Sequence, residues 1–177
     1  DGSNSPFDDR KMRYDKIEFR SESSTFSKFY LSVYLGHSNF LEYLEKKERS
    51  KKTTETLVKM GKAFYNDPHA FFPRNPGVTG IVLTSDKKLV VGERQVGEKD
   101  RYEGLLQAVA GHLTYKVNPK DINLEEEMLR ETMEEVGISK SKVSRLEFLG
   151  LYSDPSIAGD DLDFCYLINT FLIWKVK

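Results

Sequence analysis

The sequence lacks the features that mark disulfide-rich and membrane-spanning proteins. It holds a single cysteine, Cys165, among 177 residues, which excludes an internal disulfide framework. No apolar run approaches the roughly 18 residues that a membrane-spanning helix needs, and the first residues form no apolar stretch of the kind found in a signal peptide. We therefore expect an intracellular protein without a membrane partner, in the cytoplasm or in an organelle such as the mitochondrion.

An excess of charge of one sign is also missing. The 27 basic and 28 acidic residues give a net charge of −1. The chain therefore has no overall basic field to attract nucleic acid, and we do not expect a nucleic-acid partner. Hydrophobic residues make up 38% of the chain and aromatic residues 12%, which is enough to build a core. At about 150 residues per domain, the length predicts one domain with an appendage.

Residues 1–76 are predicted to form an N-terminal tail and a small α/β accessory region. Residues 1–9 look like a tag remnant or a processed end, and the polar stretch up to residue 14 is expected to fray. The hydrophobic pattern predicts, in order, strands at 16–19 and 29–35 and helices at 40–44 and 54–65. Prolines then punctuate a loop at 69–77, which we take as the boundary to the main domain.

Residues 77–177 are predicted to form the main domain, in which strands flank one strong helix. The hydrophobic pattern predicts strands at 78–84, 88–92, 105–110, 146–152 and 162–168, and a helix at 124–136. A short polar turn joins the first two strands into a hairpin, and a loop is expected from Gly111 onward. Asp121 or Asn123 is expected to cap the helix, and Gly137 to end it. This order of elements predicts an α/β fold with a mixed sheet.

The helix predicted at 124–136 has an unusual distribution of charge. At about 100° per residue, one arc is mostly apolar and should face the core: Met128, Leu129, Thr132, Met133 and Val136. The other side carries four acids, Glu127, Glu131, Glu134 and Glu135. Like charges one turn apart, and acids in the last turn, each destabilise a helix by about 0.2–1 kcal/mol. These acids either form a solvated surface or hold a divalent cation, since Mg²⁺ prefers oxygen ligands.

The end of this helix resembles the signature box of the Nudix hydrolase family. The segment Arg130–Ile138 reads RETMEEVGI, and the box has the pattern G-x5-E-x7-R-E-U-x-E-E-x-G-U, in which U is a bulky apolar residue. The resemblance implies an α/β/α sandwich of the Nudix type. The chain departs from the box in three ways. The loop after Gly111 is longer, Thr132 replaces an aliphatic residue, and Ile122 stands where the box has its first glutamate, with Asp121 beside it as a candidate substitute.

The resemblance also implies an activity and a set of site residues. Nudix enzymes use Mg²⁺, or Mn²⁺, to cleave the pyrophosphate of a nucleoside diphosphate linked to another group, with a water activated by the ion as the nucleophile. The metal ligands would be Glu131, Glu134, Glu135 and the main-chain carbonyl of Ala110. Arg130 would hold one carboxylate of this cluster in place, and Glu131 or Glu134 would be the general base.

Four further residues are candidates for contact with a small nucleotide substrate: Gly111, His112, Arg94 and Asp161. His112 follows the glycine of the box, and Arg94 stands near the end of the predicted hairpin. Asp161, with Asp160, Asp163 and less strongly Asp154, is a candidate for the remote acid that family members often add from a later loop. A histidine in solvent, a surface arginine and an ordinary polar turn are the alternatives.

A narrower resemblance covers roughly residues 15–170. The segments FYLSVYLGHSNFLEYL, GVTGIVLTSDKKLVVGERQVGE and AVAGH are similar to the Nudix branch that contains UDP-glucose pyrophosphatases. This implies a UDP-sugar substrate, with UMP and a sugar 1-phosphate as products. Family members usually continue beyond the last predicted strand, so the C-terminal part is expected to be short or incomplete. The open alternatives are a catalytically idle Nudix-fold subunit of a larger assembly and an RNA-cap or nucleotide-end hydrolase. A homodimer or a larger assembly is the expected partner state.

Overall fold

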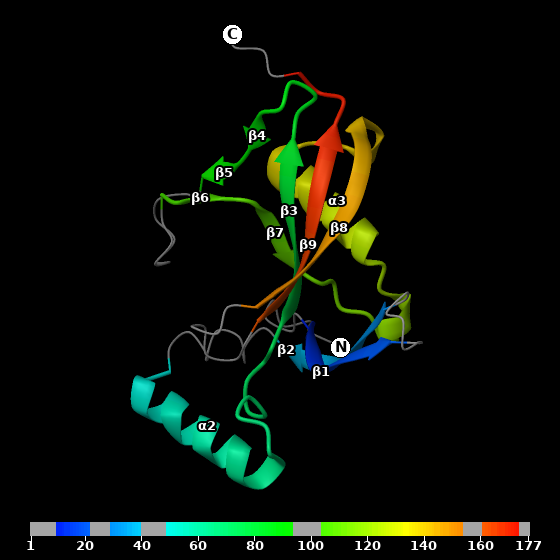
Figure 1. Ribbon diagram of the computed structural model, residues 1–177. Helices are drawn as coiled ribbons and strands as arrows, with labels where there is room; N and C mark the ends of the chain where they lie inside the picture. The colour runs from blue at the N-terminus through cyan, green and yellow to red at the C-terminus, as the bar shows by residue number, and fades with distance from the viewer. Residues whose placement is uncertain (1–9, 22–28, 40–48, 94–103, 154–160, 174–177) are drawn as a thin grey trace, which may run out of the picture. The chain divides into compact units, whose positions relative to one another are not determined.

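A computed structural model describes residues 10–21, 29–39, 49–93, 104–153 and 161–173 of the chain (Figure 1). The chain divides into two compact units, each made of three stretches of sequence. Unit 1 comprises Asp1–Pro76, Thr114–Asp121 and Ser153–Leu162. Unit 2 comprises Gly77–Leu113, Ile122–Tyr152 and Asp163–Lys177.

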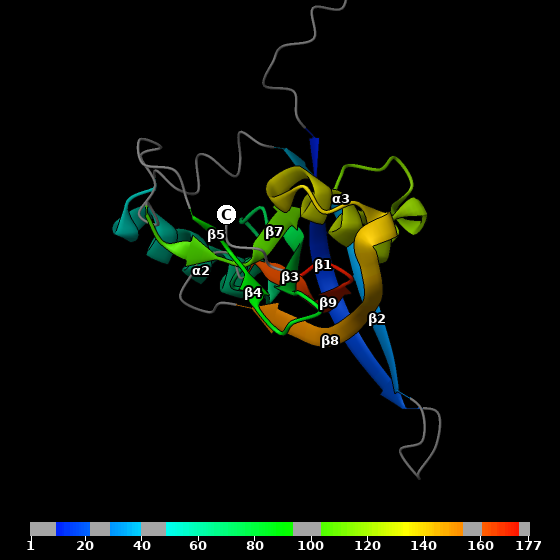
Figure 2. The same cartoon turned by 90° about the horizontal axis from the view of Figure 1, so that it is seen from above.

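Unit 1 contains a two-stranded antiparallel ribbon, a helix and a short 3₁₀ helix. The elements are β1 (Arg10–Ser21), β2 (Phe29–Asn39), α2 (Lys51–Tyr65) and η1 (Pro119–Asp121). Figure 2 shows β1 and β2 side by side along their whole length. Met12, Tyr14 and Phe72 are buried, and the Arg74 guanidinium lies over the Tyr14 ring at 4.5 Å from its centroid.

The N-terminal strand is longer than the sequence predicts. The expectation that residues up to 14 fray is wrong from Arg10 onward, because β1 begins there and pairs with β2. Met12 and Tyr14 are only 1% and 2% exposed, so two alternate side chains in the polar stretch bury apolar surface. The strand expected at 16–19 is therefore the second half of β1.

The helix predicted at 54–65 is confirmed and begins three residues earlier, as α2. The Ser50 side chain accepts a hydrogen bond from the Thr53 N–H at 3.1 Å, and Asn66 ends the helix in the left-handed conformation. The helix predicted at 40–44 lies outside the described residues.

Unit 2 is built on a mixed sheet with the strand order β4-β3-β9-β8, in which β7 also pairs with β3. The strands are β3 (Pro76–Leu83), β4 (Leu89–Val90), β7 (Val109–His112), β8 (Val143–Ser153) and β9 (Leu162–Thr170). Both β4 and β7 run antiparallel to β3, whereas the arrows of β3 and β9 point the same way in Figure 1. A separate pair, β5 (Gly92–Glu93) and β6 (Leu106–Gln107), adds two short strands. The predicted α/β class with a mixed sheet is confirmed.

The predicted hairpin at 78–92 is confirmed as β3 and β4, but β4 is shorter than the strand predicted at 88–92. Val82 pairs with Val90 and Leu83 with Leu89, and Lys87 takes a positive φ of 64° in the turn between the strands. The single strand predicted at 105–110 is instead two strands, β6 and β7. The loop expected from Gly111 begins later, because β7 continues through Gly111 to His112.

The helix α3 (Leu124–Val136) covers one face of the unit 2 sheet, as the two ribbon views show (Figures 1 and 2). Val78, Val82, Met128 and Ile168 are fully buried in this layer. A Cβ at Gly80 would lie 2.6 Å from Ile168 Cδ1 and 2.9 Å from Met128 Sδ. The missing side chain at Gly80 therefore lets the helix pack closely on β3.

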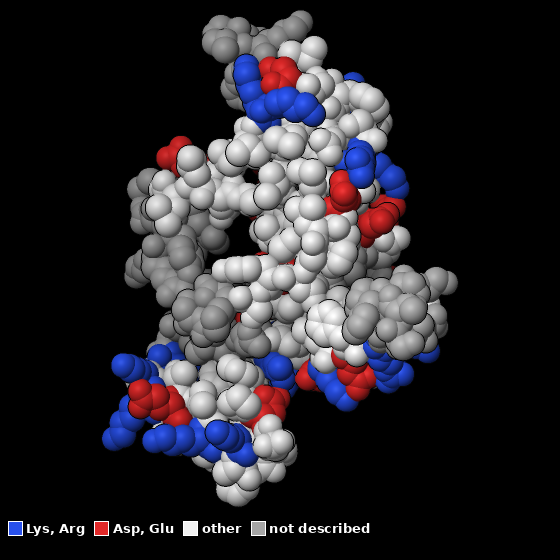
Figure 3. Space-filling model, in the orientation of Figure 1, with Lys and Arg blue, Asp and Glu red and all other residues white. Residues whose placement is uncertain are grey.

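The side chains seen over β3 and β9 in Figure 3 are mostly uncharged.

The η2 3₁₀ helix (Lys140–Lys142) links α3 to β8. None of the helices that the structure describes is long and apolar enough to cross a membrane.

Candidate metal and phosphate site

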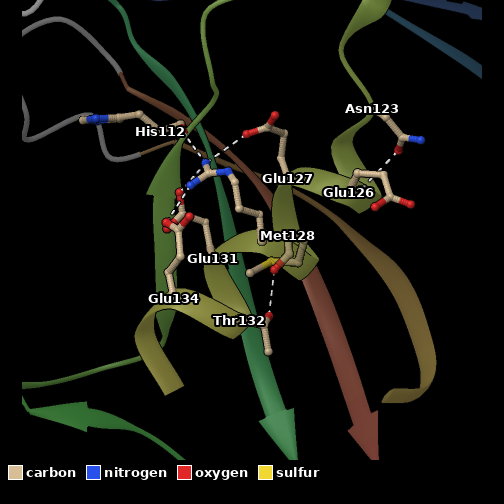
Figure 4. A network of polar contacts seen from close by, with 9 residues as sticks. His112, Asn123, Glu126, Glu127, Met128, Glu131, Thr132 and Glu134 are labelled. Carbon is tan, nitrogen blue, oxygen red and sulfur yellow. Dashed lines mark hydrogen bonds and ion pairs between the residues drawn. The ribbon is translucent and has the colours of Figure 1, made fainter. Parts of the chain in front are cut away.

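The helix that carries the candidate site begins and ends where the sequence predicts. Asn123 Oδ1 accepts hydrogen bonds from the N–H groups of Glu125 and Glu126 at 3.1 and 3.2 Å, so Asn123 is the N-cap. Figure 4 shows the bond to Glu126. Gly137 takes a φ of 68° and donates its N–H to the Met133 carbonyl at 3.0 Å. Both ends of α3 are thus fixed by local hydrogen bonds.

The apolar arc of α3 is confirmed at Met128 and Thr132, both fully buried. Thr132 stands where the Nudix box has an aliphatic residue, and its Oγ1 donates to the Met128 carbonyl at 2.7 Å (Figure 4). The buried hydroxyl is therefore hydrogen-bonded within the helix. Met133, expected in the core arc, is 52% exposed, so that expectation is wrong.

The Glu131 carboxyl group lies directly against the backbone of Gly111. Glu131 is 8% exposed, and a Cβ at Gly111 would overlap its carboxyl group. Gly111 pairs with Val78, a buried residue, so its missing side chain would point to the face that α3 covers. Only a glycine in β7 leaves this space for the carboxylate.

Arg130 is the centre of the acidic cluster. Its Nη2 donates to Glu131 Oε1 at 2.6 Å and to Glu127 Oε2 at 3.0 Å, and its Nη1 donates to Glu134 Oε2 at 2.8 Å. The His112 carbonyl accepts a longer bond from Nη2 at 3.5 Å. Figure 4 shows Glu127 on one side of this network and Glu131 with Glu134 on the other. One arginine thus binds three carboxylates and the end of β7.

Two charged groups of this cluster, half-buried Arg130 and buried Glu131, have shifted pKa values. Burial is the largest influence on Arg130 and acts to lower its pKa, but the hydrogen bond and charge of Glu127 and the charge of Glu131 outweigh it and raise the pKa. Burial raises the pKa of Glu131 above its usual 4.5, Arg130 opposes the shift, and the charges of Glu134 and Glu135 add to it. Glu131 therefore holds a proton more readily than a surface glutamate does.

Glu135 contacts the same strand from the last turn of the helix. Its Oε2 accepts a hydrogen bond from the Ala110 N–H at 3.0 Å. Glu131 at Gly111 and Glu135 at Ala110 therefore bring one face of α3 against consecutive residues of β7. The predicted ligands Glu131, Glu135 and Ala110 lie together, and Glu134 joins them through Arg130.

The donor types of this group fit a hard divalent cation. Carboxylate oxygens and a main-chain carbonyl are the ligands that Mg²⁺ prefers, and four glutamates against one arginine leave the cluster with excess negative charge. Among the described residues, no three His, Cys, Asp or Glu side chains are arranged as a metal-binding group. These residues therefore fit a cation by the type of their donor atoms and by their shared location on α3 and β7.

The predicted substrate residues have different locations. Gly111 and His112 end β7 beside Arg130, whereas Arg94 lies outside the described residues. Asp161 belongs to unit 1, and the cluster on α3 belongs to unit 2. Its neighbour Asp163, on β9, accepts a hydrogen bond from Thr79 Oγ1 at 3.1 Å.

Sequence reasoning missed the part that Glu127 plays in the cluster. The helical pattern placed it among the acids of one face without a role. The signal was its spacing, because residues three apart on a helix are neighbours and Glu127 is three before Arg130.

No protein-family model and no curated protein matches the sequence. Several solved structures are similar to the chain at low levels. The NUDIX domain of NrtR from Shewanella oneidensis, in complex with ADP ribose, is 21% identical with a TM-score of 0.40, covering 65% of this chain and 71% of that one. The MutT protein of Methanosarcina mazei Go1 is 17% identical with a TM-score of 0.40, covering 58% and 67%.

A MutT/nudix family protein from Enterococcus faecalis is 18% identical with a TM-score of 0.40. That match covers 72% of this chain and 52% of the other chain. Identities and TM-scores this low carry no conclusion about the site, so its chemistry is argued from its own residues.

Proposed function

We propose that the chain is a Mg²⁺-dependent hydrolase of the Nudix type, which cleaves the pyrophosphate of a nucleoside diphosphate linked to another group. The observation that carries the proposal is the contact between the RETMEEVG helix and the AGH segment of β7. The Glu131 carboxyl group fills the space above Gly111, and Glu135 accepts the Ala110 N–H. Two of the three glutamates that the Nudix resemblance assigns to the metal therefore contact consecutive residues of β7.

The chain's own residues divide the work of this site. Glu131, Glu134 and Glu135, with the Ala110 carbonyl, would hold the ion. The ion would supply a Lewis acid that neutralises charge on the pyrophosphate oxygens. Arg130 orients Glu131 and Glu134 through its two Nη atoms. Glu131 is the better candidate for the general base, because burial raises its pKa and makes its carboxylate more basic than an ordinary glutamate.

A UDP-sugar is the substrate that we propose in particular. The resemblance to the branch that contains UDP-glucose pyrophosphatases supports it, and that resemblance includes the AVAGH segment at the site. UMP and a sugar 1-phosphate would be the products.

The test is an assay with Mg²⁺ on UDP-glucose, ADP-ribose, diadenosine polyphosphates and capped RNA, with release of phosphomonoesters as the measurement. We expect turnover of at least one small substrate, with UDP-glucose the best. Glu134→Gln and Glu135→Gln should each lower kcat by orders of magnitude without unfolding the protein. Glu126→Gln is the matched control, because Glu126 is an exposed acid of the same helix that pairs with Lys140.

The second candidate is a catalytically idle Nudix-fold subunit of a larger assembly. Ile122 favours it, because the first glutamate of the box is missing there. A wild-type protein that is silent on every substrate, binds no Mn²⁺ and comigrates with a large complex would establish this candidate and overturn the hydrolase.

A further inference from the structure

Glu127 is the most buried acid of α3. It is 7% exposed, whereas the adjacent Glu125 and Glu126 are exposed. A buried carboxylate is costly unless a partner compensates its charge, and Arg130 Nη2 donates to Glu127 Oε2 at 3.0 Å. Glu127 also lies in the first turn of α3, where the helix dipole stabilises an anion.

We propose, building on the proposed function, that Glu127 is a positioning residue for the reaction. It holds the Arg130 guanidinium in the orientation from which Arg130 binds Glu131 and Glu134, and it neither ligates the ion nor accepts the proton.

The hydrogen bonds of Arg130 support this role. The buried Nε atom of Arg130 has no hydrogen-bond partner, so the contacts of Nη1 and Nη2 determine how the guanidinium is turned. Nη2 is shared between Glu127 and Glu131. If Glu127 loses its charge, Nη2 loses its charged partner on the side away from Glu131. The guanidinium then keeps only its bonds to Glu131, Glu134 and the His112 carbonyl and is held less firmly in this orientation.

The neighbouring sequence also favours the role. Ile122 occupies the position of the box's first glutamate and brings no carboxylate. Its candidate substitute, Asp121, belongs to unit 1 and accepts a hydrogen bond from Asn118 Nδ2 at 3.4 Å. Arg130 thus contacts two predicted ligands, Glu131 and Glu134, and a third carboxylate, which Glu127 supplies.

The experiment compares Glu127→Gln with Glu126→Gln, which removes the same charge from an exposed position one residue away. Kinetics and Mn²⁺ titration are measured on the full chain. We expect Glu127→Gln to lower kcat and Mn²⁺ affinity by about 10–100-fold, as loss of a residue that orients metal ligands does. Glu126→Gln should stay within about 2-fold. Glu127→Asp, which keeps the charge and shortens the reach, should be intermediate.

A double-mutant cycle with Arg130→Met separates positioning from direct action. If Glu127 acts through Arg130, Glu127→Gln lowers Mn²⁺ affinity by less than about 2-fold further in the Arg130→Met background. A full loss in that background would make Glu127 a ligand in its own right and overturn the proposal. So would a Glu127→Gln variant that matches Glu126→Gln. A wild-type chain without turnover or Mn²⁺ binding is a different result, which removes the proposed function and this role with it.

Discussion

At the scale of single residues, the contact between Gly111 and Glu131 is the tightest constraint on the site. A methyl group at Gly111 would overlap the Glu131 carboxyl group. We expect Gly111→Ala to lower the free energy of unfolding by about 1–3 kcal/mol through overpacking, and to lower Mn²⁺ affinity because Glu131 must move. Urea denaturation and Mn²⁺ titration measure the two effects.

Gly92→Ala is the matched control for this substitution. A Cβ at Gly92 would find its nearest neighbour, Gln107 Cγ, at 3.8 Å, which is an ordinary contact. Gly92→Ala should therefore leave the free energy of unfolding and the Mn²⁺ affinity nearly unchanged. A Gly111→Ala protein that is as stable and binds Mn²⁺ as tightly as wild type would contradict the packing described here.

The buried Glu131 carboxyl group also makes a pH-dependent contribution to stability. Burial raises its folded-state pKa above the usual 4.5, so the folded chain binds this proton more tightly than the unfolded chain. The stabilisation is full below the unfolded pKa and is lost as the pH rises through the folded pKa. We expect the stability of wild type relative to Glu131→Gln to fall across this interval. Urea denaturation at a series of pH values checks it, with Glu126→Gln as the control. A stability difference between wild type and Glu131→Gln that does not change with pH would contradict this prediction.

At the scale of elements, α3 was predictable because its signals are local. Asn123, the spacing of its apolar residues and Gly137 each determine part of the helix within a few residues of sequence. The second half of β7 was not, because Gly111 is a poor strand former and its place in the strand depends on pairing with Val78 of β3, far back along the chain. The same holds for β1, where two buried side chains in a polar segment outweigh its composition.

The N-cap of α3 can be tested separately from the site. Asn123→Ala removes an acceptor of two main-chain N–H groups and should cost about 1 kcal/mol in the free energy of unfolding. Asn118→Ala is the comparison, because the Asn118 side chain accepts only the Lys120 N–H and directly precedes the short helix η1. Thermal and urea denaturation of both variants measure the difference, and equal losses would contradict the capping role.

The site residues were predictable only where a motif names them. Glu131, Glu134 and Glu135 stand at motif positions, and the structure places Glu131 and Glu135 against β7. Glu127 stands at no such position, and its spacing from Arg130 allows the ion pair without distinguishing it from other pairs on the helix, so the pairing was recognised only in the three-dimensional structure.

At the scale of the whole molecule, neither unit is one continuous piece of sequence. The segment Thr114–Asp121 belongs to unit 1 although unit 2 residues flank it. Within unit 1, the Lys116 N–H contacts Met12 Sδ at 3.5 Å, and the Lys116 carbonyl lies 3.2 Å from His37 Nε2. The Arg10 guanidinium lies over the Tyr115 ring at 4.6 Å. These contacts tie the strands β1 and β2 to a segment that follows β7 in the sequence.

A fragment of residues 77–177 would lose all of these contacts with β1 and β2. We expect it to unfold at a lower urea concentration than the full chain and with a smaller m-value, because less surface is buried. Circular dichroism during urea titration measures both quantities. An unchanged midpoint would mean that residues 114–121 need no partner from the N-terminal strands.

The fit of Glu131 above Gly111 has a consequence for the history of this chain. A lineage that acquired a side chain at position 111 would have had to move or give up the carboxylate at position 131, and a lineage that lost the carboxylate would be released from glycine. Among descendants of a common ancestor the two positions should therefore change together, and a retained glycine would mark those in which the acid is still in use.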